Sequence, residues 1–111
     1  MTARQGTTRY AVRLSVPRRG SLRAWRAVSD DFEDGLARQE SATVAAPHLE
    51  SESRRGRESV RVLVVATVSA ADVAEALDIA WQVFGWAAGA DTEGWDMAAA
   101  VAEVRPEDPA P

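Results

Sequence analysis

β-prone residues dominate residues 58–68 of the chain, and polar residues are confined to its two ends. Valine occupies every second position from residue 60 to residue 64 and recurs at residue 68, whereas both faces are apolar from residue 63 to residue 66. Apolar runs of this kind are typical of a strand that is covered on both sides or lies at the centre of a sheet. We therefore predict a central strand over Val60–Val68.

An amphipathic helix is predicted directly after this strand, from about Ala70 to Gly89. Ser69 supplies a candidate N-cap hydroxyl, and Asp72 follows three residues later, where its carboxylate can complete a capping box. Gly89 is suited to end the helix. At 100° per residue, one face is apolar and the other is largely polar. The apolar face comprises Val73, Leu77, Ala80, Phe84 and Ala87, and the opposite face comprises Glu75, Asp78, Gln82 and Trp86.

The first half of the chain contains a second strand and a second helical pattern. Residues 9–16 alternate as in a strand that is buried on one face, and Pro17–Gly20 is expected to end it. Its apolar positions are Tyr10, Val12, Leu14 and Val16. Apolar residues then recur at steps of three and four, which predicts a helix over 21–39. Because Ser29 precedes a run of acidic residues, the alternative is a strand or loop over 22–28 followed by a shorter helix that begins near residue 29.

Two further strands complete the predicted sheet. Residues 48–53 are polar and alternating and lie a hairpin's length before the central strand, so we predict an exposed edge strand paired with it. Pro47 excludes a central-strand hydrogen bond at that point. Residues 95–105 are ambiguous, because Ala98–Ala100 favours a helix whereas the alternation of residues 96–101 is compatible with a strand. We predict a strand that ends at Pro106.

The resulting order is strand, helix, strand, strand, helix, strand. This order resembles the ferredoxin-like superfold, an α+β βαββαβ sandwich in which two helices cover one face of an antiparallel sheet. The resemblance rests on element order and spans the predicted single domain, residues 9–106, with flexible tails at 1–8 and 107–111. Because this superfold hosts oxygenases, ligand sensors, RNA-binding modules and assembly modules, it does not select a function.

Composition narrows the environment more than the activity. The chain has 111 residues, no cysteine and a formal net charge of −4. It contains no apolar run of about 18 residues, so we expect a cytoplasmic protein without a membrane-spanning segment. Residues 1–26 are rich in arginine and contain no acid, whereas residues 27–52 contain seven acids and one arginine. Intramolecular pairing of the two blocks is therefore favoured over nucleic-acid binding.

Four tryptophans carry most of the information about contacts, because tryptophan is enriched at interface hot spots. Trp25 and Trp81 fall on or beside the apolar faces of the predicted helices and are interpreted as core or boundary residues. Trp86 projects from the outward face of the second helix, and Trp95 follows in the next turn. We interpret Trp86 and Trp95 as interaction residues; the alternative is that they stack on each other over the helix end.

Candidate chemistry is sparse. His48, Glu50 and Glu52 are spaced two apart and would point the same way on a strand, as in a metal or acid–base group, but an exposed polar edge is the simpler interpretation. Arg18 and Arg19, at the start of a predicted helix, form a weak candidate anion site. No G-x-S-x-G turn or phosphate-binding glycine loop is present. We predict no cofactor, metal or catalytic residue.

The predicted function is that of a non-enzymatic interaction or assembly component that acts as a homo-oligomer. Its sheet face away from the helices would pack on a second copy if Leu63 and Val65 lie there and the last strand adds Ala98 and Ala100. The alternatives are a ligand-binding or cofactor-free oxygenase-like dimer and, third, a nucleic-acid-binding protein. A cavity would favour the ligand-binding alternative if it were lined by Tyr10, Trp25, Phe32 or Phe84.

Overall fold

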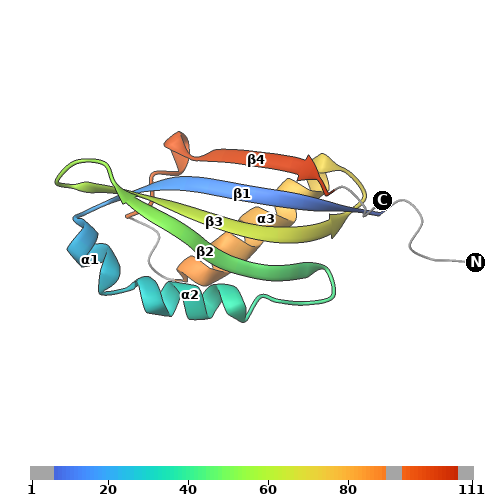
Figure 1. Ribbon diagram of the computed structural model, residues 1–111, viewed down its shortest axis with the longest axis horizontal. Coiled ribbons are helices and arrows are strands. Elements are labelled where there is room, and N and C mark those ends of the chain that lie inside the picture. Colours follow the sequence, from blue (N-terminus) through green and yellow to red (C-terminus); the bar gives the residue numbers. More distant parts are fainter. Residues whose placement is uncertain (1–6, 90–93, 108–111) are drawn as a thin grey trace, which may run out of the picture.

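Four antiparallel strands form one open sheet in the order β2-β3-β1-β4 in the computed structural model, which describes residues 7–89 and 94–107 (Figure 1). Three α-helices and a short 3-10 helix complete the α+β architecture. The elements are β1 (Thr8–Arg19), α1 (Leu22–Arg26), α2 (Ser29–Ala37), β2 (Val44–Arg54), β3 (Ser59–Ala70), α3 (Val73–Ala88), η1 (Met97–Ala99) and β4 (Val101–Pro106).

Strands β1 and β3 form the centre of the sheet and pair along their whole length, from Thr8 opposite Ala70 to Arg19 opposite Ser59. The prediction of a central strand at residues 60–68 is confirmed. The predicted end of the first strand at Pro17 is wrong, because β1 continues to Arg19. Proline lacks an N–H group, but the Pro17 carbonyl remains available and accepts a hydrogen bond from the Asp96 amide at 2.9 Å.

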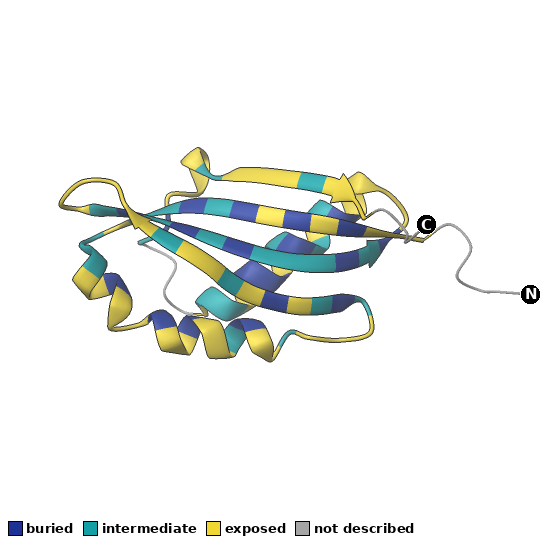
Figure 2. Cartoon of the chain, viewed as in Figure 1, coloured by how far each residue is buried: buried dark blue, intermediate teal, exposed yellow. Residues whose placement is uncertain are grey.

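One face of the central strands is sealed and the other is partly open (Figure 2). On β1 the side chains alternate between buried and more accessible positions, and β3 follows the same alternation. The buried positions are Tyr10, Val12, Leu14, Val16, Val60, Val62, Val64, Val68 and Ala70, and they belong to one core cluster with the helices. The prediction of a half-buried first strand is confirmed, whereas β3 is fully covered on one face only.

Helix α3 begins three residues later than predicted. Its N-cap is Asp72, whose Oδ1 accepts a hydrogen bond from the Glu75 amide at 2.8 Å, and the Glu75 carboxylate accepts one from the Ala71 amide at 2.7 Å. This is a variant of the capping box, in which Glu75 accepts from the amide before the N-cap rather than from the N-cap amide itself. Ser69 cannot cap the helix because it still pairs with Arg9 in the sheet. Gly89 is confirmed as the C-cap, with a φ of 61°.

The buried face of α3 is also rotated from the predicted one. Val73, predicted to be in the core, is 48% exposed. The buried residues of the helix are Ala76, Ala80, Val83 and Phe84. The sealed stripe is therefore narrower than predicted and made mostly of small side chains, which lets α3 lie close to the sheet and to α2.

The single helix predicted over 21–39 is in fact two helices. Ser21 caps α1 through its hydroxyl, which accepts a hydrogen bond from the Ala24 amide at 3.1 Å, and α2 follows after a break at Ala27 and Val28. The alternative of a shorter helix near residue 29 is closer to the structure. In α2, a Cβ atom on Gly35 would lie 2.9 Å from the Cα of Ala87, so glycine permits the close crossing of α2 and α3.

Both edges of the sheet differ in detail from the prediction. The edge strand β2 is longer than residues 48–53 and contains two irregularities in register, one of which includes Pro47 and Ala46, whose φ is 49°. The strand predicted over 95–105 is wrong in its first part: residues 97–99 form η1, and β4 begins at Val101.

The predicted tails are only partly described. Thr8 already belongs to β1, and the Glu107 amide donates a hydrogen bond to the Arg9 carbonyl at 2.7 Å, so both residues are tied to the sheet. Residues 1–6 and 108–111 lie outside the described residues. Within the described ranges, none of the helices has the length and apolar character that a membrane crossing requires.

Candidate functional site

Trp95 is held against the end of β1 by backbone hydrogen bonds on both sides. The Arg19 amide donates to the Gly94 carbonyl at 2.8 Å, and the Asp96 amide donates to the Pro17 carbonyl at 2.9 Å, with an isolated bridge between Arg18 and Trp95. These contacts fix the indole in place, and Trp95 is 7% exposed.

Trp95 lies at the centre of an aromatic cluster rather than on the surface. Its ring centroid is 4.9 Å from that of Phe84, 5.4 Å from that of Phe32 and 5.5 Å from that of Trp25. Most of these pairs are edge-to-face, an arrangement that adds about 0.5–1.5 kcal/mol per pair beyond the burial of area. The cluster joins α1, α2, α3 and the segment before β4.

The structure does not bring Trp86 and Trp95 together. Trp86 is 73% exposed on α3, whereas Trp95 is buried, so neither the stacked pair nor a joint patch is formed. Trp25, at 1% exposed, is in the core as predicted, and Trp81 lies at the boundary with its ring 5.7 Å from that of Phe84. The pattern of the sequence placed Trp95 wrongly because its partners come from distant segments.

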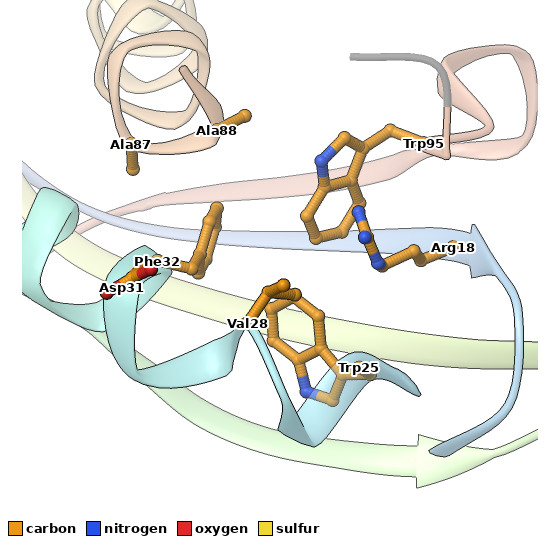
Figure 3. A pocket seen from close by; sticks show the side chains of 8 residues that line it. All are labelled: Arg18, Trp25, Val28, Asp31, Phe32, Ala87, Ala88 and Trp95. Atoms are coloured by element: carbon orange, nitrogen blue, oxygen red, sulfur yellow. The ribbon is translucent and has the colours of Figure 1, made fainter. Parts of the chain in front are cut away.

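An open pocket of about 450 Å³ lies beside this cluster (Figure 3). Its size is within the range of small-molecule sites, about 300–1,000 Å³. The lining residues are Arg18, Trp25, Val28, Asp31, Phe32, Ala87, Ala88 and Trp95. Aromatic and aliphatic side chains make up most of this lining, with one guanidinium and one carboxylate, a composition typical of small-molecule sites.

Arg18 forms one wall of the pocket. Its guanidinium carbon lies 5.0 Å from the ring centroid of Trp95 and 5.5 Å from that of Trp25, within the range of cation–π attraction. Arg19, the adjacent strand residue, is exposed. The two arginines therefore do not form a joint anion site. Arg18 precedes a helix of only five residues whose first turn is capped by Ser21.

Two buried hydrogen-bond donors lie beside the pocket. The indole Nε1 atoms of Trp25 and Trp95 are shielded from solvent and have no hydrogen-bond partner among the described residues. Burying such a donor costs about 1–3 kcal/mol when it stays unsatisfied. Trp25 and Phe32 were expected to line any cavity, whereas Arg18 and Trp95 were assigned to an anion site and to an exposed contact, because they lie far apart along the chain and meet only through the sheet.

The face of the sheet away from the helices is the second candidate surface. Leu63 and Val65 are half-buried there, beside the small residues Ala11 and Ser15, and Val101 of β4 is 58% exposed. The expectation that Ala98 and Ala100 extend this face is wrong, because they precede β4. We call the surface around Leu63, Val65 and Val101 the open face.

Basic and acidic side chains alternate across the open face. The Arg13 guanidinium lies 2.9 Å from the Glu50 carboxylate of β2 and 3.7 Å from the Glu103 carboxylate of β4. Arg61 donates a hydrogen bond to the Ser15 hydroxyl at 2.8 Å. Because acids separate the arginines among these described residues, no continuous basic stripe of the kind expected for a nucleic-acid interface is formed here.

The predicted cluster of His48, Glu50 and Glu52 is not assembled. The register of β2 shifts between Leu49 and Ser51, so Glu50 pairs with Arg13 on the open face while Glu52 lies 3.6 Å from Arg26 on the helix side. A regular strand would have pointed all three residues the same way, and the irregularity was not visible in the pattern. No metal-binding group of three such residues is found among the described residues.

Comparisons with protein-family models, with curated proteins and with solved structures found no match to this chain.

Proposed function

We propose that the chain is a non-enzymatic interaction or assembly component that forms a homodimer through the open face of its sheet. We further propose that its fold is ferredoxin-like. Two β-α-β units with antiparallel neighbours support this assignment, since β1 and β2 flank β3 while β3 and β4 flank β1. The observation that carries the dimer is the half-buried apolar centre of the open face at Leu63 and Val65.

The open face approaches the size that a dimer interface needs. The four strands contain 12, 11, 12 and 6 residues. At about 3.3 Å per residue and about 4.8 Å between strands, they cover roughly 650 Å². A stable interface buries about 800 Å² on each partner, so most of this face would be covered by a second copy.

The charges of the open face also suit a second copy. Arg13 is already paired with acids from both edge strands, so the face carries both signs in close alternation and two copies do not repel each other. Arg13 lies opposite Val65 on the central strands, so the interface would combine apolar contacts at Leu63 and Val65 with ion pairs that cross the same face.

The edges of the sheet are less suited to pairing than its face. Pro47 lies within one of the two irregularities of β2, and β4 has only six residues. Irregular, proline-containing and short edges oppose strand addition. Packing of face on face is therefore the form of self-association that the geometry favours.

Trp86 is proposed as a second contact between copies, one that joins dimers into larger assemblies. It belongs to the helix layer, on the opposite side of the sheet from the open face, and it lines a shallow hollow with Arg38, Thr43 and Ile79. An exposed tryptophan beside a hollow is a typical hot spot for protein contact. Trp95 is left out of this proposal because it is buried.

Light scattering of the purified protein at low and high salt tests the proposal. We expect a dimer at both salt concentrations, and we expect Leu63→Arg to yield a folded monomer because it places a charge at the centre of the interface. Val73→Arg, an exposed position on α3, is the matched control and should remain dimeric. A wild-type monomer at millimolar concentration, or a dimeric Leu63→Arg variant, would contradict the open-face dimer.

The Trp86 contact has its own measurement. At high protein concentration the wild type should scatter as species larger than a dimer, and Trp86→Ala should reduce them to dimers. If the wild type remains a dimer at every concentration, the second contact does not exist.

The pocket beside Trp95 supports a second candidate, a ligand-binding dimer. The cavity is lined by Trp25 and Phe32, two of the residues that this alternative requires.

A further inference from the structure

We propose that the pocket beside Trp95 binds a small planar aromatic molecule that carries a hydrogen-bond acceptor, such as a carboxylate or a carbonyl group. The proposal goes beyond self-association and does not depend on it, because the pocket lies on the helix side of the sheet, away from the open face.

The Trp95 indole supplies a donor that the protein itself does not use. Its Nε1 atom is buried and has no hydrogen-bond partner among the residues that the structure describes, although Trp95 is only 7% exposed. Figure 3 shows the nitrogen-bearing edge of this ring turned toward the side of the pocket where Ala87 and Ala88 lie. A phenylalanine would fill the core here without leaving a donor, so a ligand acceptor is the natural partner of this N–H group.

The donor is also preorganised. Backbone hydrogen bonds at Arg19 and Asp96 hold the segment on both sides of Trp95, and three aromatic neighbours fix its ring. A rigid donor loses little conformational entropy when a ligand binds, which favours affinity.

The walls of the pocket suit a flat apolar ring. Phe32 and Trp95 present aromatic surface on two sides, and Val28, Ala87 and Ala88 keep the space between the helix ends clear of long side chains. Aromatic pairs are stable with ring centroids about 4.5–7 Å apart, so a planar ligand can continue the edge-to-face packing of the cluster.

Two charged side chains line the pocket, one beside the Trp95 ring and one at the mouth. The Arg18 guanidinium lies against the Trp95 ring and contributes positive charge to the inner wall. The carboxylate in the lining, from Asp31, belongs to an exposed residue at the start of α2.

Titration with 2-naphthoate, followed by the indole N–H signals in ¹H–¹⁵N spectra of the full chain, tests the proposal. We expect the Trp95 signal to move downfield and saturate, because its N–H gains an acceptor, while the Trp86 signal stays in place. The cation 2-naphthylmethylammonium has the same ring without an acceptor and should leave the Trp95 signal unchanged. Equal shifts with both probes would reduce the pocket to a nonspecific apolar hollow and overturn the proposal.

Two helix variants locate the binding. Ala88→Leu fills the pocket from α3 and should weaken 2-naphthoate binding at least about tenfold, because ligand and side chain compete for the same space. Ala74→Leu, exposed near the other end of α3, is the matched control and should bind like the wild type. No saturable Trp95 shift in the wild type, or equal affinity of the two variants, would overturn the assignment. Neither result bears on the oligomeric state, so this proposal and the dimer can fail separately.

Discussion

The two faces of strands β1 and β3 are made from alternate residues of the same segments, yet they form surfaces of different kinds. On the helix side, Val62 is fully buried and Val64 is 3% exposed, and the aromatic cluster closes one end of the layer. On the open side, Leu63 and Val65 are half-buried and are surrounded by ion pairs that remain in contact with water. One face stabilises the fold, and the other is available for contact.

This difference teaches that hydrophobicity alone does not assign a residue to the core. Residues 62–65 are all large and apolar, but helices cover only every second one. The neighbours across the sheet decide the rest: β1 places Leu14 and Val16 on the helix side, and Arg13 and Ser15 on the open side. An apolar residue whose neighbours across the sheet are polar stays partly exposed to water. Burial of such a residue against a partner is favourable.

The largest loss of stability is expected from removing the Phe32 ring on the helix side of the sheet. Its ring contacts Trp25, Phe84 and Trp95, and it is 4% exposed. Phe32→Ala should lower the free energy of unfolding by about 3–5 kcal/mol, because it removes a buried ring and leaves a cavity. Urea denaturation measures the loss. Trp86→Ala, at an exposed ring, is the control and should change stability by less than about 0.5 kcal/mol at a concentration where it is a dimer. Equal losses would show that the cluster does not stabilise the fold.

A matched pair of valines compares the two faces directly. Val64→Ala on the helix side should cost about 2–3 kcal/mol, since two buried methyl groups contribute about 0.8 kcal/mol each and the remaining cavity adds to the cost. Val65→Ala on the open side should cost under about 1 kcal/mol when the protein is dilute. Denaturation at low and high protein concentration separates two cases: a loss at Val65 that grows with concentration indicates an interface, whereas a constant small loss indicates a face that stays in water.

Much of the sheet could be predicted from the sequence because its signals are local. The alternation at Tyr10–Val16 and the valines of residues 60–68 specify two strands and their buried faces without reference to the rest of the chain. Positions that depend on distant contacts could not be predicted in this way. Ser69 has the residue type of an N-cap, but pairing with Arg9 keeps it in the sheet, so Asp72 caps the helix instead.

The candidate site was harder to predict than the fold for the same reason. Trp95 follows a glycine-rich stretch and has no periodic apolar neighbours, so the pattern favoured the surface. Its burial results from the bridge to Arg18 at the end of β1. The irregular register of β2 likewise separates Glu50 from Glu52, although their spacing suggested one face.

Substitution of two glycines by alanine tests how closely α2 and α3 pack against each other. Gly35→Ala in α2 would place a Cβ atom 2.9 Å from the Cα of Ala87 and 3.1 Å from its carbonyl oxygen, so the helices must separate. Overpacking of this kind costs about 1–3 kcal/mol. Gly85→Ala on the exposed side of α3 meets nothing within 4 Å and should instead stabilise the helix by up to about 1 kcal/mol. Thermal unfolding should therefore shift in opposite directions for the two variants; shifts of the same sign would contradict the close crossing.

The smallest change in monomer stability is expected from substitution of Arg13 on the open face. Its side chain is 45% exposed, and those of Glu50 and Glu103 are 40% and 47% exposed, so water and salt screen both ion pairs. Arg13→Gln should cost under about 1 kcal/mol in dilute protein. A second copy on the open face would remove this water, and loss of the cation would then leave the Glu50 carboxylate buried without its partner, at a cost of about 3–5 kcal/mol, whereas Glu103 keeps its ion pair with Arg105. Sedimentation of Arg13→Gln over a range of concentrations distinguishes the two situations. A weakened dimer with an unchanged monomer stability supports the interface, whereas an unchanged dimer would show that the open face is not where the copies meet.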